Sequence, residues 1–118
     1  MKFYLPFLIS LSALLLGCAA TRDMPSIEIG GVKIYSRENW HSLPVHSGYK
    51  PHQIKKITLH HGGVIFNGEK PTSQYLRNLQ VWSRRERPWP DIPYHFIIDL
   101  AGKIWQGRPL QYAGDTNT

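Results

Sequence analysis

Residues 93–108 read PYHFIIDLAGKIWQGR, and this stretch decides the fold. Pro93 to Leu100 and Lys103 to Arg108 are rich in the β-branched and aromatic residues that favour strands. Ala101 and Gly102 supply a turn between them. The stretch therefore predicts two consecutive strands joined by a short turn.

A helix is expected just before this hairpin, over Thr72 to Arg87. Thr72 or Ser73 is the expected N-cap, and Pro88 ends the helix. Residues that recur at helical spacing form one apolar face: Tyr75, Leu76, Leu79 and Trp82. Three arginines in the last turn are expected to form a solvated, dipole-stabilised helix end rather than a binding patch: Arg84, Arg85 and Arg87.

The segments before the helix predict a further hairpin and a further strand. Residues 27–29 and 32–35 alternate apolar and polar side chains around Gly30-Gly31, which is typical of an edge hairpin. Residues 36–53 are expected to be loop. Residues 54–60, IKKITLH, predict a buried strand. Strand, helix, strand, strand in this order predicts a mixed α/β fold.

The amino-terminal residues predict export. Lys2 is followed by an apolar run from Phe3 to Leu16, too short for the roughly 20 residues of a membrane-spanning helix. The run closes in Leu-Leu-Gly-Cys, which resembles the bacterial lipobox. That resemblance implies a lipoprotein signal peptide over 1–17, lipidation at Cys18 and a flexible tether over 18–26. The protein is then exported and lipid-anchored to a bacterial membrane facing the cell wall, in the periplasm or at the outer membrane of a Gram-negative source.

The bulk composition narrows the partners. The chain has 118 residues, enough for one domain, and its single cysteine excludes an internal disulfide. Its net charge of +6 suits an anionic partner such as a membrane surface or an acidic wall polymer. No nucleic-acid-binding motif is present, so nucleic acid is not expected as a partner. The sequence leaves the oligomeric state open.

Candidate chemistry gathers where two of the expected strands begin or end. His60-His61 closes the 54–60 strand and is followed by Gly62-Gly63, and imidazole is a good zinc ligand. Two adjacent histidines on a strand point to opposite faces, so they cannot both bind one ion. A tyrosine such as Tyr94 can donate a hydrogen bond to an oxyanion. Taken singly, these residues are explained better by structural or surface roles.

Four motifs in order change this assessment: SRENW at 36–40, ITLHH at 57–61, PYHFII at 93–98 and GKIWQGR at 102–108. Together they resemble the peptidoglycan recognition proteins and the amidase-type phage lysozymes, a family that contains zinc-dependent N-acetylmuramoyl-L-alanine amidases. The resemblance runs from about Val32 to Arg108. It implies a mixed central β-sheet flanked by helices, with residues 27–118 as the amino-terminal part of an amidase domain that is incomplete at its C-terminus.

The resemblance also implies roles for individual residues. His60 corresponds to a Zn²⁺ ligand and Tyr94 to the catalytic tyrosine, whereas His61 matches the histidine that does not bind the metal. Other residues are expected to be structural or near the site: His95, Trp40 and Arg108. The remaining zinc ligands have no counterpart in this sequence, and Asp115 stands where many members carry a histidine, which puts substrate contacts there in doubt.

The implied function is hydrolysis of the amide between the lactyl group and L-alanine in peptidoglycan. Two alternatives remain open at this point. The protein could be a non-catalytic lipoprotein that binds peptidoglycan or muropeptides, or it could be an inactive truncated fragment.

Overall fold

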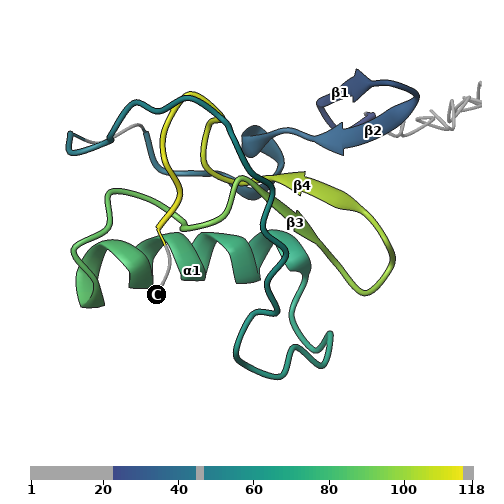
Figure 1. The fold of residues 1–118 in the computed structure, drawn as a ribbon. Coiled ribbons are helices and arrows are strands. Elements are labelled where there is room, and N and C mark those ends of the chain that lie inside the picture. The colour runs from purple at the N-terminus through teal and green to yellow at the C-terminus, as the bar shows by residue number, and fades with distance from the viewer. Residues whose placement is uncertain (1–22, 45–46, 116–118) are drawn as a thin grey trace, which may run out of the picture.

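The computed structural model describes residues 23–44 and 47–115. The expected signal peptide, Cys18 and the first part of the tether lie outside the described residues. In chain order the elements are β1 (Ser26–Ile29), β2 (Val32–Tyr35), the 3-10 helix η1 (Arg37–Trp40), α1 (Thr72–Glu86), β3 (Phe96–Ile98) and β4 (Ile104–Gln106) (Figure 1). Ser26, expected in the tether, is already part of a strand, and η1 lies in a segment expected to be loop.

The described strands form one mixed sheet in the order β1-β2-β4-β3. β1 pairs antiparallel with β2, and β3 pairs antiparallel with β4. The two hairpins are joined by parallel pairing of β2 with β4, which aligns Ile34 with Ile104 and Tyr35 with Trp105. The chain between β2 and the second hairpin carries η1 and α1. The expected mixed α/β fold is therefore confirmed.

Both hairpins were correctly expected, although β3 and β4 are each only three residues long. The second turn is made by Gly102, whose φ of 75° lies in the left-handed region that glycine enters at little cost. Beyond the strands, the two arms of this hairpin remain hydrogen-bonded. The backbone N–H of Gly107 donates to the carbonyl of His95 (2.8 Å), and that of Arg108 donates to the carbonyl of Tyr94 (2.7 Å).

The hydrophobic core lies where α1, η1 and β4 meet. Its buried residues are Trp40, Leu76, Ile92 and Trp105, and partly buried residues pack around them: Tyr35, Tyr75, Leu79 and Ile97. Burial of apolar surface is the main favourable contribution to the free energy of folding. In the described parts of the chain, no helix combines the length and the apolar character needed to cross a membrane.

Helix α1 occupies the expected residues, but two details were wrong. Pro71 is the N-cap and no side chain caps the helix; Thr72 instead donates its hydroxyl to Asp99 at 3.1 Å. Trp82, assigned to the apolar face, is exposed, because the buried stripe on α1 consists of Leu76, Gln80 and Ser83. The apolar pattern correctly predicts that the segment is helical. It does not predict which face is buried, because Gln80 is buried through hydrogen bonds to residues outside the helix.

The arginines after this stripe were also misassigned in part. Arg84 is not solvated at the helix end: its guanidinium donates to the carbonyls of Pro90 and Pro44, both at 2.7 Å. Arg87 lies over the rings of Trp82 and Trp89. Arg85 does fit the expectation, because it is exposed and pairs only with its neighbour Glu86.

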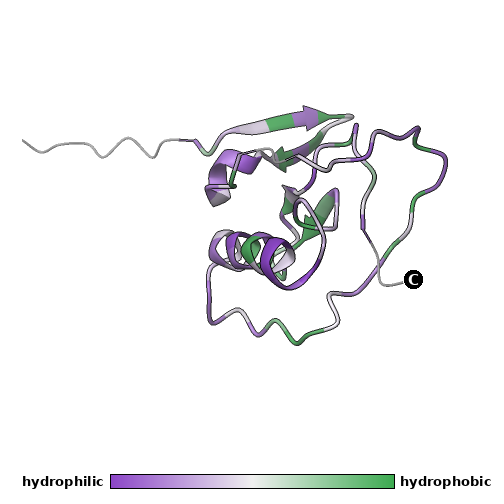
Figure 2. Cartoon of the chain, turned by 90° about the vertical axis from the view of Figure 1, so that its left-hand side faces the viewer, coloured by the Kyte–Doolittle hydropathy of each residue, from purple (hydrophilic) through white to green (hydrophobic). Residues whose placement is uncertain are grey.

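The expected buried strand over 54–60 is wrong. Within the described residues this segment belongs to no strand, and Ile57 and Leu59 are 97% and 91% exposed. Figure 2 shows the segment running apart from the helix and the strands. A β pattern becomes a strand only when its backbone pairs with a neighbouring edge, and β3 forms no such pair with it.

Asp99 joins the second hairpin to the start of α1. One carboxylate oxygen accepts from the backbone of Ala101 and Lys103 (both 2.9 Å), and the other from the Trp105 indole (2.9 Å) and Thr72 (3.1 Å). Burial alone would raise the pKa of Asp99, but these hydrogen bonds together hold it below the ordinary value.

This lowered pKa predicts an acid-sensitive contribution to folding. Because the folded-state pKa lies below the unfolded one, the stabilisation is complete above the unfolded value of about 4 and is lost as pH falls through the folded value. We expect the free energy of unfolding of the wild-type protein to fall below pH 4, and Asp99→Asn to flatten this fall. Asp23→Asn, at an exposed aspartate, is the control. Identical pH profiles for all three proteins in urea titrations would contradict this assignment.

Candidate functional site

Tyr94 is held in place by the end of the second hairpin. Its carbonyl accepts from the backbone N–H of Arg108, and Gly107 lies directly against it. A Cβ on Gly107 would sit 2.2 Å from the Tyr94 carbonyl oxygen, a distance that no side chain can tolerate. Glycine at 107 is therefore required for the backbone at Tyr94 to come this close.

The structure brings His60 and Tyr94 together. Their ring centroids are 6.1 Å apart and their planes are tilted by 38°. His60 is exposed and Tyr94 is half-buried, so both side chains are accessible to solvent. Two of the residues that the sequence singled out, 34 positions apart, thus form one small site.

A glycine loop borders this site and leads to α1. His61 accepts a hydrogen bond on Nδ1 from the backbone of Gly63 (3.2 Å), which has a φ of 72° in the left-handed region. A Cβ on Gly62 would lie 3.7 Å from the hydroxyl of Tyr75 on α1. His61 therefore shapes the loop through its own contact, away from the pair formed by His60 and Tyr94.

The described residues do not form a zinc site by themselves. Over 23–44 and 47–115, no group of three or more His, Cys, Asp or Glu side chains could hold a metal ion. Catalytic zinc generally has three protein ligands and a water, and His60 supplies one imidazole. No metal-dependent step can therefore be derived from these residues.

Two expected structural residues make structural contacts. Trp40 is fully buried, and its indole N–H donates to the carbonyl of Gln106 at 2.9 Å. The Nε2 of His95 lies 2.7 Å from the carbonyl oxygen of Tyr112, and its ring stacks on His52 with centroids 5.6 Å apart. Both side chains hold the segments that flank Tyr94.

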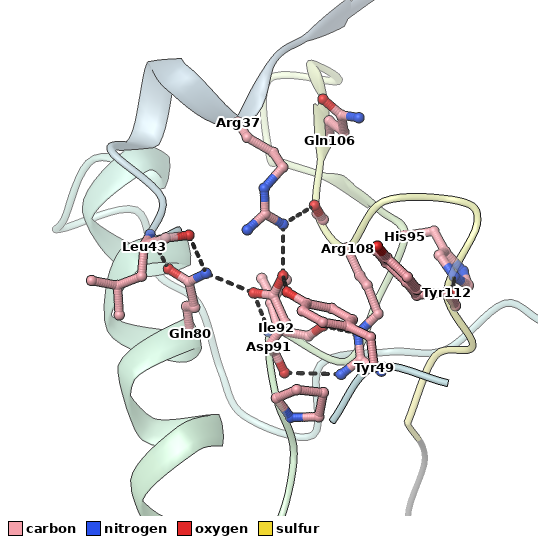
Figure 3. Close-up of polar contacts among 12 residues, drawn as sticks. Arg37, Leu43, Tyr49, Gln80, Asp91, Ile92, His95, Gln106, Arg108 and Tyr112 are labelled. Carbon is pink, nitrogen blue, oxygen red and sulfur yellow. Dashed lines mark hydrogen bonds and ion pairs between the residues drawn. The ribbon is translucent and has the colours of Figure 1, made fainter. Parts of the chain in front are cut away.

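Arg108 is also structural, at only 2% exposure. Its guanidinium donates to the carbonyls of Ile92 and Asp91, both at 3.0 Å (Figure 3). It also pairs with Asp115 at 2.6 Å. Together with the hydrogen bond from Arg108 to the carbonyl of Ala113, the Asp115 pair holds residues 113–115 against the body of the fold.

Sequence reasoning missed Asp91, whose buried side chain has four partners. This fully buried carboxylate accepts hydrogen bonds from Gln80 (2.7 Å), the backbone of Ile92 (2.8 Å) and the hydroxyl of Tyr49, and pairs with Arg37 at 2.9 Å (Figure 3). The only sequence signal was a single acid in the proline-rich segment just before Tyr94.

The contact with Asp91 also fixes the protonation state of Tyr49. Burial, the hydrogen bond to the carboxylate and the negative charge of that carboxylate raise the pKa of Tyr49 to about 12. Tyr49 therefore stays protonated at physiological pH and remains the donor. Arg37 balances the negative charge of Asp91, and the neutral donors stabilise that charge by hydrogen bonds.

Removal of the Asp91 carboxylate should strongly destabilise the fold. Asp91→Ala leaves the mostly buried Arg37 without its counter-charge, and breaking a buried pair in this way costs about 3–5 kcal/mol. The free energy of unfolding in urea measures this loss. The matched control is Glu86→Gln, which breaks the exposed pair with Arg85 and should cost less than about 1 kcal/mol. Equal effects of the two substitutions would contradict the central role of Asp91.

Comparisons with known proteins point to one group. No protein-family model matches the chain. The chain is 30% identical over 84 residues to peptidoglycan recognition protein 1 of Mus musculus, which covers 70% of this chain and 46% of the mouse protein. It is 30% identical over 95 residues to peptidoglycan-recognition protein SD of Drosophila simulans, covering 75% of this chain and 51% of that protein. The chain thus spans about half the length of these relatives.

A solved structure agrees with the sequence relatives. The crystal structure of Drosophila peptidoglycan recognition protein SD superposes with a TM-score of 0.59 at 26% sequence identity, covering 71% of this chain and 52% of that one. This likeness supports the amidase and peptidoglycan recognition fold that the four motifs implied. In both sequence and fold, the chain is similar to the peptidoglycan recognition proteins.

Proposed function

We propose that the protein recognises peptidoglycan fragments at the site formed by His60 and Tyr94. The observation that carries this proposal is the contact between these two rings beside a glycine loop. An exposed imidazole and a half-buried phenol offer hydrogen bonds to a polar ligand, and Gly62-Gly63 leaves room for a ligand to approach the backbone. The similarity of the chain to peptidoglycan recognition proteins supports peptidoglycan as the ligand.

The charge of the chain is compatible with this ligand. The net charge is +6, and peptidoglycan fragments carry carboxylates on their stem peptides. A basic protein gains association rate and local concentration on an anionic polymer. This general attraction complements the site, since it does not depend on the geometry of His60 and Tyr94.

Sedimentation of the protein with insoluble purified peptidoglycan would test this recognition. We expect His60→Ala combined with Tyr94→Phe to reduce the bound fraction by about 10-fold, as expected when two hydrogen-bonding groups are lost. The matched control is His41→Asn, which removes another exposed histidine at a left-handed position that asparagine tolerates. No difference between the site variant and this control would show that binding, if any, is non-specific attraction.

Zinc-dependent N-acetylmuramoyl-L-alanine amidase activity is the second candidate. One observation favours it, namely that the expected ligand His60 and the expected catalytic residue Tyr94 are neighbours. The described residues provide a single imidazole for the metal, so recognition is the function that they support better. Stoichiometric zinc in the purified protein, together with release of stem peptides from peptidoglycan, would decide for the amidase.

We also propose that the protein works outside the cytoplasm, attached to a bacterial membrane through lipid on Cys18. The apolar run over 3–16 and the lipobox-like Leu-Leu-Gly-Cys support this proposal. We expect Cys18→Ser to move the protein from the membrane to the soluble fraction, because the acyl chains provide the anchoring free energy. Fractionation of a variant that still sediments with membranes would refute the anchor.

A further inference from the structure

Tyr75 lies beside the proposed site but belongs to none of the roles assigned so far. It sits in the first turns of α1, next to Leu76, whose full burial anchors this part of the helix. Its ring packs on Phe66 from the neighbouring loop, with centroids 4.9 Å apart and planes tilted by 48°. The ring is therefore in contact both with Phe66 and with the hydrophobic core.

The hydroxyl of Tyr75 points to the glycine loop. Its oxygen lies 3.7 Å from the place that a Cβ on Gly62 would occupy, so glycine leaves open space directly in front of it. Within the described residues, no hydrogen bond is made by the side-chain hydroxyl of either Tyr75 or Tyr94. Neither hydroxyl is among the buried side-chain atoms without a partner, so both reach solvent, where a bound ligand can take the place of water.

The negative charge of an ionised Tyr94 acts on the hydroxyl of Tyr75. Burial raises the pKa of Tyr75, and the proximity of Tyr94 raises it further. Tyr75 therefore keeps its proton under physiological conditions and can serve as a hydrogen-bond donor. Both phenols lie beside the loop that follows His60, because Tyr94 is next to His60 and the hydroxyl of Tyr75 is next to Gly62.

We propose that Tyr75 is a ligand-binding residue of this site, whose hydroxyl donates to a carbonyl oxygen in the stem peptide of a muropeptide bound beside Tyr94. The inference rests on the proposed function and names the part of the ligand that is read. A peptide backbone offers one carbonyl oxygen at every residue as an acceptor for a hydroxyl donor such as that of Tyr75. The rings of Phe66 and Tyr75 provide an apolar wall for small side chains such as that of alanine.

Isothermal titration of the full chain with N-acetylmuramoyl-L-alanyl-D-isoglutamine tests this role. Tyr75→Phe removes only the hydroxyl and retains the ring on Phe66. We expect it to raise the dissociation constant about 3- to 10-fold, as for the loss of one hydrogen bond to a neutral acceptor. The matched control is Tyr35→Phe, in a tyrosine that packs on Trp105 in the sheet, and it should change the constant less than about 2-fold.

Thermal melting separates a binding role from a structural one. We expect Tyr75→Phe without ligand to melt within about 1 °C of the wild type, since no intramolecular hydrogen bond is lost, and to gain less melting temperature on addition of the ligand. Wild-type binding that Tyr75→Phe leaves unchanged would overturn the role of Tyr75 while preserving the proposed function. A lower melting temperature of the free variant with unchanged affinity would show that the hydroxyl is structural. Absence of wild-type binding would refute the proposed function itself.

Discussion

The buried carboxylate of Asp91 is the interaction on which the rest of the structure depends. It collects a cation from η1, an amide from α1 and a phenol from the loop between them, so three segments distant in sequence meet at one group. A buried charge is tolerated only when such partners surround it. Asp91 lies three positions before Tyr94, and its own carbonyl accepts from Arg108. Asp91 therefore holds together the buried polar groups and also positions the segment that leads into β3.

Of the two residues of the proposed site, only Tyr94 is held by contacts with this buried part of the structure. Tyr94 is backed by Gly107 and Arg108, and its flanks are tied down by His95 and by the contact of Arg108 with Asp115. His60 comes instead from an exposed segment that forms no strand in the described chain. Segments with few buried contacts open at low free-energy cost, which suits a loop that must admit a ligand. The rings of Tyr75 and Phe66 connect this loop to α1.

The features that sequence predicted well are those encoded locally. The hairpin turns follow from glycines, and the span of α1 follows from its apolar period and the prolines around it. The strand over 54–60 failed because pairing depends on a partner edge that a local pattern does not contain. Asp91 was missed for the same reason: its burial is determined by Arg37, Tyr49 and Gln80, none of which is near it in sequence. His60 and Tyr94 were found through the order of motifs, whereas Tyr75 was seen only as part of an apolar helix face.

The central claim is that a muropeptide binds where the loop after His60 meets Tyr94. The most direct measurement is amide chemical-shift mapping of the ¹⁵N-labelled protein during titration with N-acetylmuramoyl-L-alanyl-D-isoglutamine. We expect the largest shifts in residues 60–66, at Tyr94 and in the first turn of α1, and no shifts in residues 84–89, at and just beyond the other end of that helix. Saturable shifts centred on residues 84–89, or no shifts at ligand concentrations that saturate binding, would contradict this claim.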